Sequence, residues 1–402
     1  MNSIINKACG RESITSRRPT EELFADHMRH LQQFVERLCQ RFCLDYILIA
    51  SGSINYHFHD DREYPFKVSP YFKYWLPLID HPNSYLLLRP GEKPTLLLYQ
   101  PDDMWLAWPG LDRCDWQAVG AISTLFEISE IKQINEIVGL YPLLAKQSTK
   151  GVFIGPTDCL HNDWLIDRIN DSEVLSFIHY HRSYKTPYEV QCLYQANIRS
   201  VPGHKKAHAL FKSGATEAQI LWGFLQANGI IQQDRPYDPM IAQNENAGIL
   251  HYQHKSMELP ATGLRSLLID AANDYVGYAA DITRTYSYRE DDFATLIGDF
   301  DILQRELVGQ IKVGMTQAEL HDQACQRIAH FMHDHHFITC SAEQADTERL
   351  VEYFFPHGLG HMLGLQVHDV GGHLLDESGT QAAQGPRYPK QRNRTIDSGM
   401  VF

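Results

Sequence analysis

The 402 residues of this chain suffice for two or three domains with a sizeable buried core, which excludes a single small binding module. Hydrophobic residues make up 44% and charged residues 21%, the balance of a globular protein, and no apolar run approaches the roughly 18 residues of a membrane-spanning helix. The net charge of −13 repels nucleic acid and anionic lipid, so we expect neither as a partner. The first 25 residues contain no apolar core of a secretory signal and the eight cysteines form no C-x-x-C pair, so we expect a cytoplasmic protein without disulfides.

Residues 1–183 are predicted to form an N-terminal α/β domain. Apolar residues recur at helical spacing from Thr20 to Cys43, and a further helix is expected near 129–146. Strand-like runs lie at 46–50, 84–88, 95–99 and 151–154. Pro187 favours the start of a long helix, so the second domain is placed at 184–402.

Two similar segments 100 residues apart indicate an internal repeat. Thr216 with Gln219, and Thr316 with Glu319, follow the pattern of a capping box that begins an amphipathic helix. We interpret them as marking two halves of a duplicated α/β unit. Helices would then pack on one face of a curved sheet and leave the other face for a site between the halves.

Two aspartates belong to a predicted hairpin. One strand ends at Asp270, a second strand contains Asp281, and the turn is expected around Asn273 and Asp274. A hairpin brings both carboxylates to one face, where they repel each other unless they share a proton or a cation. The alternative is structural, with Asp270 capping the turn and Asp281 paired with Arg284.

A histidine-rich segment follows towards the end of the chain. His357, His361 and His368 alternate with glycines, which favours a strand or loop rather than a helix, and no His-Glu-x-x-His motif is present. A second cluster, at 330–336, is interpreted as an exposed helix end. Residues 244–254 place polar turn residues before a short apolar strand that ends at His251.

Together, the Asp-x10-Asp and His-x6-His patterns resemble the metal-dependent family of aminopeptidase P, prolidase and methionine aminopeptidase. The resemblance runs from about residue 20 to the end, and 60–67 with 72–77 are similar to the prolidase and organophosphorus-acid-anhydrolase branch. It implies an α/β (α+β) protein whose N-terminal domain precedes a catalytic domain with the "pita-bread" fold. It also implies a homodimer in which the loop around Asp60 and Asp61 reaches the partner's active site.

Carried over to this chain, the metal ligands of the family fall on three residues. Asp270 corresponds to the bidentate ligand of one ion, Asp281 to the bridge between two ions, and His361 to the imidazole ligand of the other. A carboxylate-rich pair of divalent sites favours Mn²⁺, with Co²⁺ and Zn²⁺ as alternatives. The family also uses two glutamate ligands, which would lie beyond Phe402, so we expect a C-terminally incomplete catalytic domain with weakened metal binding and activity.

Four further residues match the substrate pocket of the family. His251 and His368 correspond to the histidines that hold the substrate and stabilise the tetrahedral intermediate, and Tyr237 and His357 correspond to pocket residues of the dipeptidase branch. The implied reaction is hydrolysis of Xaa-Pro dipeptides by a metal-activated water. The alternatives are an aminopeptidase for longer Xaa-Pro peptides and a non-catalytic binding protein that keeps the fold without its metals.

Overall fold

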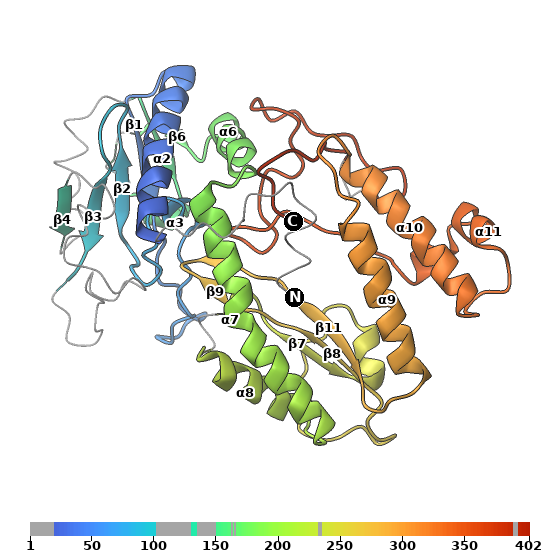
Figure 1. Ribbon diagram of the computed structural model, residues 1–402. Coiled ribbons are helices and arrows are strands. Elements are labelled where there is room, and N and C mark those ends of the chain that lie inside the picture. Colours follow the sequence, from blue (N-terminus) through green and yellow to red (C-terminus); the bar gives the residue numbers. More distant parts are fainter. Residues whose placement is uncertain are drawn as a thin grey trace.

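The computed structural model describes residues 20–101, 130–134, 150–161, 164, 166–231, 235–388 and 393–402. A mixed sheet forms the N-terminal part, and a smaller antiparallel sheet with long helices forms the rest (Figure 1). The helices are α2 (Thr20–Phe42), α3 (Pro70–Lys73), α6 (Ser172–Arg182), α7 (Pro187–Lys212), α8 (Glu217–Asn228), α9 (Asp292–Val308), α10 (Gln317–Asp334) and α11 (Ala342–Thr347), with 3-10 turns at Thr157–Cys159, Asn244–Gly248 and Leu350–Tyr353. None of the helices within these ranges is long and apolar enough to cross a membrane.

The N-terminal sheet has the order β4-β3-β2-β1-β5-β6. Its strands are β1 (Tyr46–Ala50), β2 (Tyr85–Leu88), β3 (Thr95–Tyr99), β4 (Glu130–Ile134), β5 (Gly151–Ile154) and β6 (Arg168–Ile169). Side chains alternate between its faces, so that Ile47 and Ile49 pack beneath α2 while Tyr46 and Leu48 belong to a second cluster on the other face. The four strands predicted from the sequence are confirmed.

The helix expected near 129–146 is wrong at its beginning. Residues 130–134 form β4, which pairs in parallel with β3, and residues 135–146 lie outside the described part of the chain. Ile131 and Ile134 are spaced as on a helix, but the unpaired edge of β3 offers backbone hydrogen bonds that override this local pattern.

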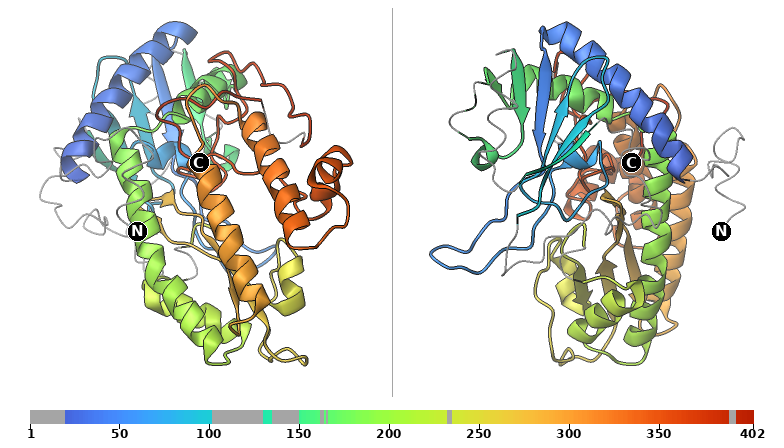
Figure 2. Two further views of the ribbon diagram at one scale, coloured as in Figure 1. Left: turned by 45° about the vertical axis from the view of Figure 1, so that its right-hand side comes forward. Right: turned by 90° about the vertical axis from the view of Figure 1, so that its left-hand side faces the viewer.

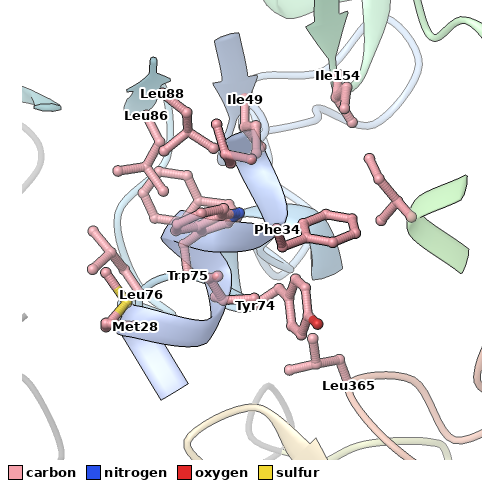
Figure 3. Close-up of a cluster of buried hydrophobic side chains, with 14 of the residues drawn as sticks. Met28, Phe34, Ile49, Tyr74, Trp75, Leu76, Leu86, Leu88, Ile154 and Leu365 are labelled. Atoms are coloured by element: carbon pink, nitrogen blue, oxygen red, sulfur yellow. The ribbon is translucent and has the colours of Figure 1, made fainter. Parts of the chain in front are cut away.

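One hydrophobic cluster joins the N-terminal part to the C-terminal part. Met28 and Phe34 of α2 and Trp75 belong to the same cluster as Tyr278 and Leu365. Figure 3 shows Leu365 beside Tyr74, below the side chains of α2 and the sheet. The two halves of the chain therefore share one core rather than meeting at a polar interface.

The C-terminal part contains an antiparallel sheet of order β11-β8-β7, made of β7 (Met240–Gln243), β8 (Ser266–Asp270) and β11 (Thr283–Ser287). Leu267 and Ile269 of β8 pack against α7 and α8, which cover one face of this sheet (Figure 1). Because side chains alternate along a strand, Leu268 and Asp270 point to the opposite face. The helix layer thus directs Asp270 away from the core.

Both capping boxes predicted for the repeat are present, at Thr216 before α8 and at Thr316 before α10. The second half otherwise departs from the expected pattern of helices followed by strands. Beyond Ser287 the described residues form helices and loops, with only isolated bridges at Thr316–Thr395 and Leu374–Gln381. The histidine-rich segment instead bonds to other elements, for example through Ala279 N–H and the carbonyl of Gly364 (2.9 Å).

A buried histidine connects α2 to the start of α7. His27 is 1% exposed, and its two ring nitrogens lie 2.9 Å from the hydroxyl of Thr186 and 2.9 Å from the carbonyl of Tyr74. A neutral ring satisfies both contacts by donating with one nitrogen and accepting with the other. Burial lowers the pKa of His27 from 6.5 to about 4, although the Tyr74 carbonyl partly opposes it.

We expect this histidine to make the protein less stable in weak acid. Between pH 6.5 and about 4 the unfolded chain binds a proton at His27 that the folded chain does not, so stability is present above pH 6.5 and is lost as the pH falls through this window. The shift corresponds to about 3 kcal/mol. Urea unfolding at several pH values should show that the free energy of unfolding depends less steeply on pH in His27→Gln than in the wild type. The exposed His330→Gln should keep the wild-type slope, and an unchanged slope in His27→Gln would contradict the assignment.

Candidate active site

The two aspartates lie where β8 ends and β11 begins. Asp270 is the last residue of β8 and pairs with Thr283, the first residue of β11, while Asp281 lies two residues before that strand. The predicted hairpin is thus present, but Asp281 precedes its second strand instead of belonging to it.

A second, smaller hairpin connects the two strands. It consists of β9 (Asp274–Tyr275) and β10 (Tyr278–Ala279), and its turn is formed by Val276 and Gly277 with φ of 48° and 85°. The turn predicted at Asn273 and Asp274 is therefore wrong. Gly277 adopts the positive φ without strain, and a Cβ there would lie 2.6 Å from Cδ of Lys73, so a larger residue would also displace that lysine side chain.

Asp270 receives a hydrogen bond from a tyrosine. The hydroxyl of Tyr237 donates to Oδ1 of Asp270 at 2.6 Å. Burial raises the pKa of Asp270 and the charge of Asp281 adds to this effect, against the hydrogen bonds from Tyr237 and Thr283. Burial also raises the pKa of Tyr237, and the negative charges of Asp270 and Asp281 raise it further. Asp281 is thus close enough to Asp270 for its charge to act on that carboxyl group.

Asp281 contacts His361. Nε2 of the imidazole lies 3.2 Å from Oδ2 of the carboxylate, and both side chains are partly exposed. Burial alone raises the pKa of Asp281, but the hydrogen bond and charge of His361 lower it overall. Burial conversely lowers the pKa of His361, and Asp281 more than offsets this. Arg284 donates to the carbonyl of Thr283 at 2.7 Å, so the alternative Asp281–Arg284 pair is not what the structure shows.

His368 and His251 lie around this pair. The ring of His368 is 4.1 Å from that of His361, centroid to centroid. Its pKa is lowered by burial and then by the positive charges of His361 and His251. His251 lies in a turn that follows the 3-10 segment Asn244–Gly248 rather than at the end of a strand, because the strand ends earlier, at Gln243.

The structure does not bring His357 to the aspartates. Its ring is exposed and lies 4.7 Å from that of Phe355, centroid to centroid, and its Nδ1 lies 2.9 Å from the carbonyl of Gly358. Its charge acts instead on His321 of α10. Among the contacts of the described residues, none joins His357 to Asp270 or Asp281.

Asp270, Asp281 and His361 carry the types of ligand atom that bind divalent cations. Two partly buried carboxylates whose charges oppose each other, with an imidazole in contact, form an arrangement that a cation relieves. Within the described residues, no three His, Cys, Asp or Glu side chains converge closely enough to hold an ion as they stand. The 3.2 Å between Nε2 of His361 and Oδ2 of Asp281 is a separation that two ligands of one ion can have.

Sequence reasoning missed a buried ion cluster directly beside His368. The carboxylate of Asp369 lies 2.7 Å from a guanidinium nitrogen of Arg182 and 2.8 Å from Nζ of Lys185. Each of the three side chains is 1% exposed. The available signals were an aspartate adjoining a candidate site histidine and two cations in the segment between the predicted domains.

Comparison with known families divides the chain into two matches. Residues 22–180 match the N-terminal domain of Xaa-Pro dipeptidase, and residues 191–402 match metallopeptidase family M24. The chain belongs to metallopeptidase family M24. The family resemblance predicted from the two motifs is therefore confirmed, and membership in M24 implies divalent metal ions.

This M24 chain is similar over most of its length to bacterial relatives. It is 39% identical over 377 residues to a Xaa-Pro dipeptidase of Colwellia psychrerythraea, covering 94% of this chain and 83% of the relative. It is 40% identical over 385 residues to a Xaa-Pro dipeptidase of Erwinia tasmaniensis, covering 94% and 85%.

Solved structures show the same fold for this M24 chain. Proline aminopeptidase P II from Yersinia pestis superposes with a TM-score of 0.67 at 19% identity, covering 95% of each chain. A zinc-substituted aminopeptidase P of Escherichia coli gives 0.69 at 19% identity, covering 92% of this chain and 85% of that one. The predicted α/β fold class with a pita-bread catalytic part is confirmed.

Proposed function

We propose that this chain is a Xaa-Pro dipeptidase, a metal-dependent enzyme that hydrolyses dipeptides with proline at the C-terminal position. One observation carries the proposal: Asp270, Asp281, His361 and His368 gather around the end of β8 in an M24 chain. The relatives that match 94% of this chain at 38–40% identity are themselves Xaa-Pro dipeptidases, which supports the choice of substrate.

In this proposal Asp270, Asp281 and His361 hold the metal, as two divalent ions of which Mn²⁺ suits the oxygen-rich donor set. Bound ions supply Lewis-acid chemistry, polarising the scissile carbonyl and lowering the pKa of the attacking water. His361 would ligate as a neutral imidazole.

His368 and His251 act on the peptide in this proposal. Burial and neighbouring imidazoles lower the pKa of His368, which keeps the ring neutral and able to donate one hydrogen bond to a carbonyl as negative charge develops there. Tyr237 orients Asp270 through its 2.6 Å hydrogen bond and borders the pocket. The pocket role of His357 stays a prediction.

We expect a full-length form of the protein, supplied with Mn²⁺, to hydrolyse Gly-Pro, Ala-Pro and Leu-Pro. Tripeptides of the form Xaa-Pro-Yaa should be cleaved about tenfold more slowly or worse, because a dipeptide pocket closes on the proline carboxylate. Release of free proline, measured for matched dipeptide and tripeptide panels, checks this. Comparable rates on both panels would assign the chain to the aminopeptidase alternative, and failure to bind any divalent ion would favour the non-catalytic one.

We propose two domains, 1–183 and 184–402. The boundary is supported by the family matches, which end at residue 180 and begin again at residue 191. It is also supported by α7, which begins at Pro187 after a capping box formed by Thr186 and Glu189.

We also propose a homodimer in which the hairpin around Asp60 and Asp61 reaches the partner. Tyr56 bridges Glu63 across this hairpin, and Phe58 at its tip is 92% exposed. Figure 2 (right) shows the segment after β1 extending away from the body of the molecule. Light scattering should give twice the chain mass, and a monomer with full activity would exclude the proposal.

A cytoplasmic location completes the proposal. In the described part of the chain, Cys39, Cys43, Cys159, Cys192, Cys325 and Cys340 are free thiols, as is usual in a reducing compartment. Fractionation of cells that express the protein tests the location, and recovery outside the cytoplasm would exclude it.

A further inference from the structure

We infer that Asp369 is a positioning residue: with Arg182 and Lys185 it forms a buried ion cluster that fixes the loop carrying His361 and His368. The inference rests on the function proposed above, because it assigns the cluster to the chemistry of these two histidines. None of the three clustered side chains needs to contact substrate or metal. They act through the backbone that they hold.

The cluster connects two distant segments of the chain. Arg182 ends α6 and Lys185 lies just before α7, whereas Asp369 directly follows His368. The carboxylate uses its two oxygens for the two cations, Oδ1 for Arg182 at 2.7 Å and Oδ2 for Lys185 at 2.8 Å. Burial raises the pKa of Asp369, but these two cations outweigh burial and lower it overall. Asp369 is therefore held as a carboxylate in a fixed orientation.

The backbone of Asp369 closes the loop between the two histidines. Asp369 N–H donates to the carbonyl of Met362 at 2.9 Å, which joins the residue after His368 to the residue after His361. A Cβ at Gly364 would lie 2.0 Å from Oδ2 of Asp369, so the ion pair rests directly against the loop backbone. The positions and orientations of the His361 and His368 rings thus depend on the buried contacts of Asp369.

The cations that hold Asp369 are themselves fixed. The guanidinium of Arg182 lies over the rings of Tyr71 and Tyr74, 5.6 Å and 5.7 Å from their centroids. Lys185 donates through Nζ to the carbonyl of Arg182 and through its backbone N–H to Gly399 at 2.7 Å. The cluster is therefore held by three parts of the chain: the N-terminal part, the segment before α7, and the stretch around Gly399.

The buried ion cluster is better suited to positioning the loop than to stabilising the fold. A buried ion pair returns little net stability compared with apolar residues of similar volume, because desolvation of the charges offsets their attraction. What such a pair does supply is directional contact. The side chain of His368 is only partly buried, so its order depends on the adjoining backbone and on its neighbour His361.

The test compares three variants of the full chain. Asp369→Asn removes the charge but keeps the shape, and should lower kcat about 10- to 100-fold while KM changes less than about threefold. Asp369→Asn combined with Lys185→Met removes one charge of each sign, so it should recover stability lost in the single variant without recovering kcat. Glu377→Gln is the matched control, since Glu377 also bonds to α6, at 2.7 Å from His181, but does not adjoin the histidine loop.

A second readout does not depend on activity. In the metal-free chain labelled at histidine, Asp369→Asn should replace the single imidazole NMR signals of His361 and His368 by several or broadened ones, and leave those of His251 unchanged. Unchanged His361 and His368 signals, or a kcat that returns with stability in the double variant, would overturn the inference. If the wild type cleaves no Xaa-Pro dipeptide, the proposed function fails, while the NMR comparison still decides whether Asp369 positions the loop.

Discussion

Asp281→Ala is expected to lower kcat/KM for Gly-Pro by roughly 1,000-fold or more, equivalent to about 4 kcal/mol, and to reduce the bound metal. Asp281 contacts His361 and its charge acts on Asp270, so its removal leaves a divalent ion with one carboxylate from this part of the site. The chain should still fold, because the substitution also removes the charge that opposes ionisation of Asp270. Metal per chain, thermal unfolding and Gly-Pro hydrolysis are measured on the same preparation.

His368→Ala serves as the matched variant for Asp281→Ala. It should lower the rate about 100-fold with metal content largely kept, because His368 contacts the ring of His361 and faces the substrate rather than the ions in the proposed arrangement. Loss of metal in His368→Ala together with retention in Asp281→Ala would contradict the assigned roles.

Gly371→Ala is expected to cost about 2–5 kcal/mol of the free energy of unfolding. Gly371 has a φ of 89°, which an alanine adopts at a cost. Its added Cβ would also lie 2.2 Å from the carbonyl oxygen of His179 and 3.0 Å from Cβ of Ser183. The first of these atoms belongs to the backbone of α6, which cannot move aside as a flexible side chain can.

Gly214→Ala isolates the conformational contribution, and its difference from Gly371→Ala gives the steric one. Gly214 has a similar φ of 86°, but a Cβ there meets nothing within 4 Å, so only the conformational cost of about 1–2 kcal/mol remains. Urea unfolding of both variants measures the difference. Equal losses of stability would show that α6 does not approach Gly371 as closely as described.

Local signals allowed much of the fold to be predicted. The strands 46–50 and 95–99 and the capping boxes before α8 and α10 are found at the predicted residues, because each depends on a few neighbours in sequence. β4 was missed because its partner strand, rather than its own spacing, decides its structure.

Only those residues of the candidate site that belong to a sequence motif could be predicted. Spacing alone pointed to Asp270 and Asp281 on one hairpin, and their proximity follows from the register of β8 and β11. The buried partner of Asp369 was not predictable in this way, since Arg182 lies 187 residues away in the sequence. His357 belongs to the same motif as His361, yet it lies on an exposed stretch of the loop, which no spacing rule distinguishes.

The shared core has a consequence for how this protein can evolve. A single hydrophobic cluster contains Met28 and Trp75 from the segment that matches the first family model and Tyr278 and Leu365 from the segment that matches the second. Exchange of the first segment for that of a distant relative would uncover Tyr278 on the short hairpin that leads to Asp281. Exchange of one segment between relatives is therefore constrained, and substitutions on one side of this core call for compensating substitutions on the other.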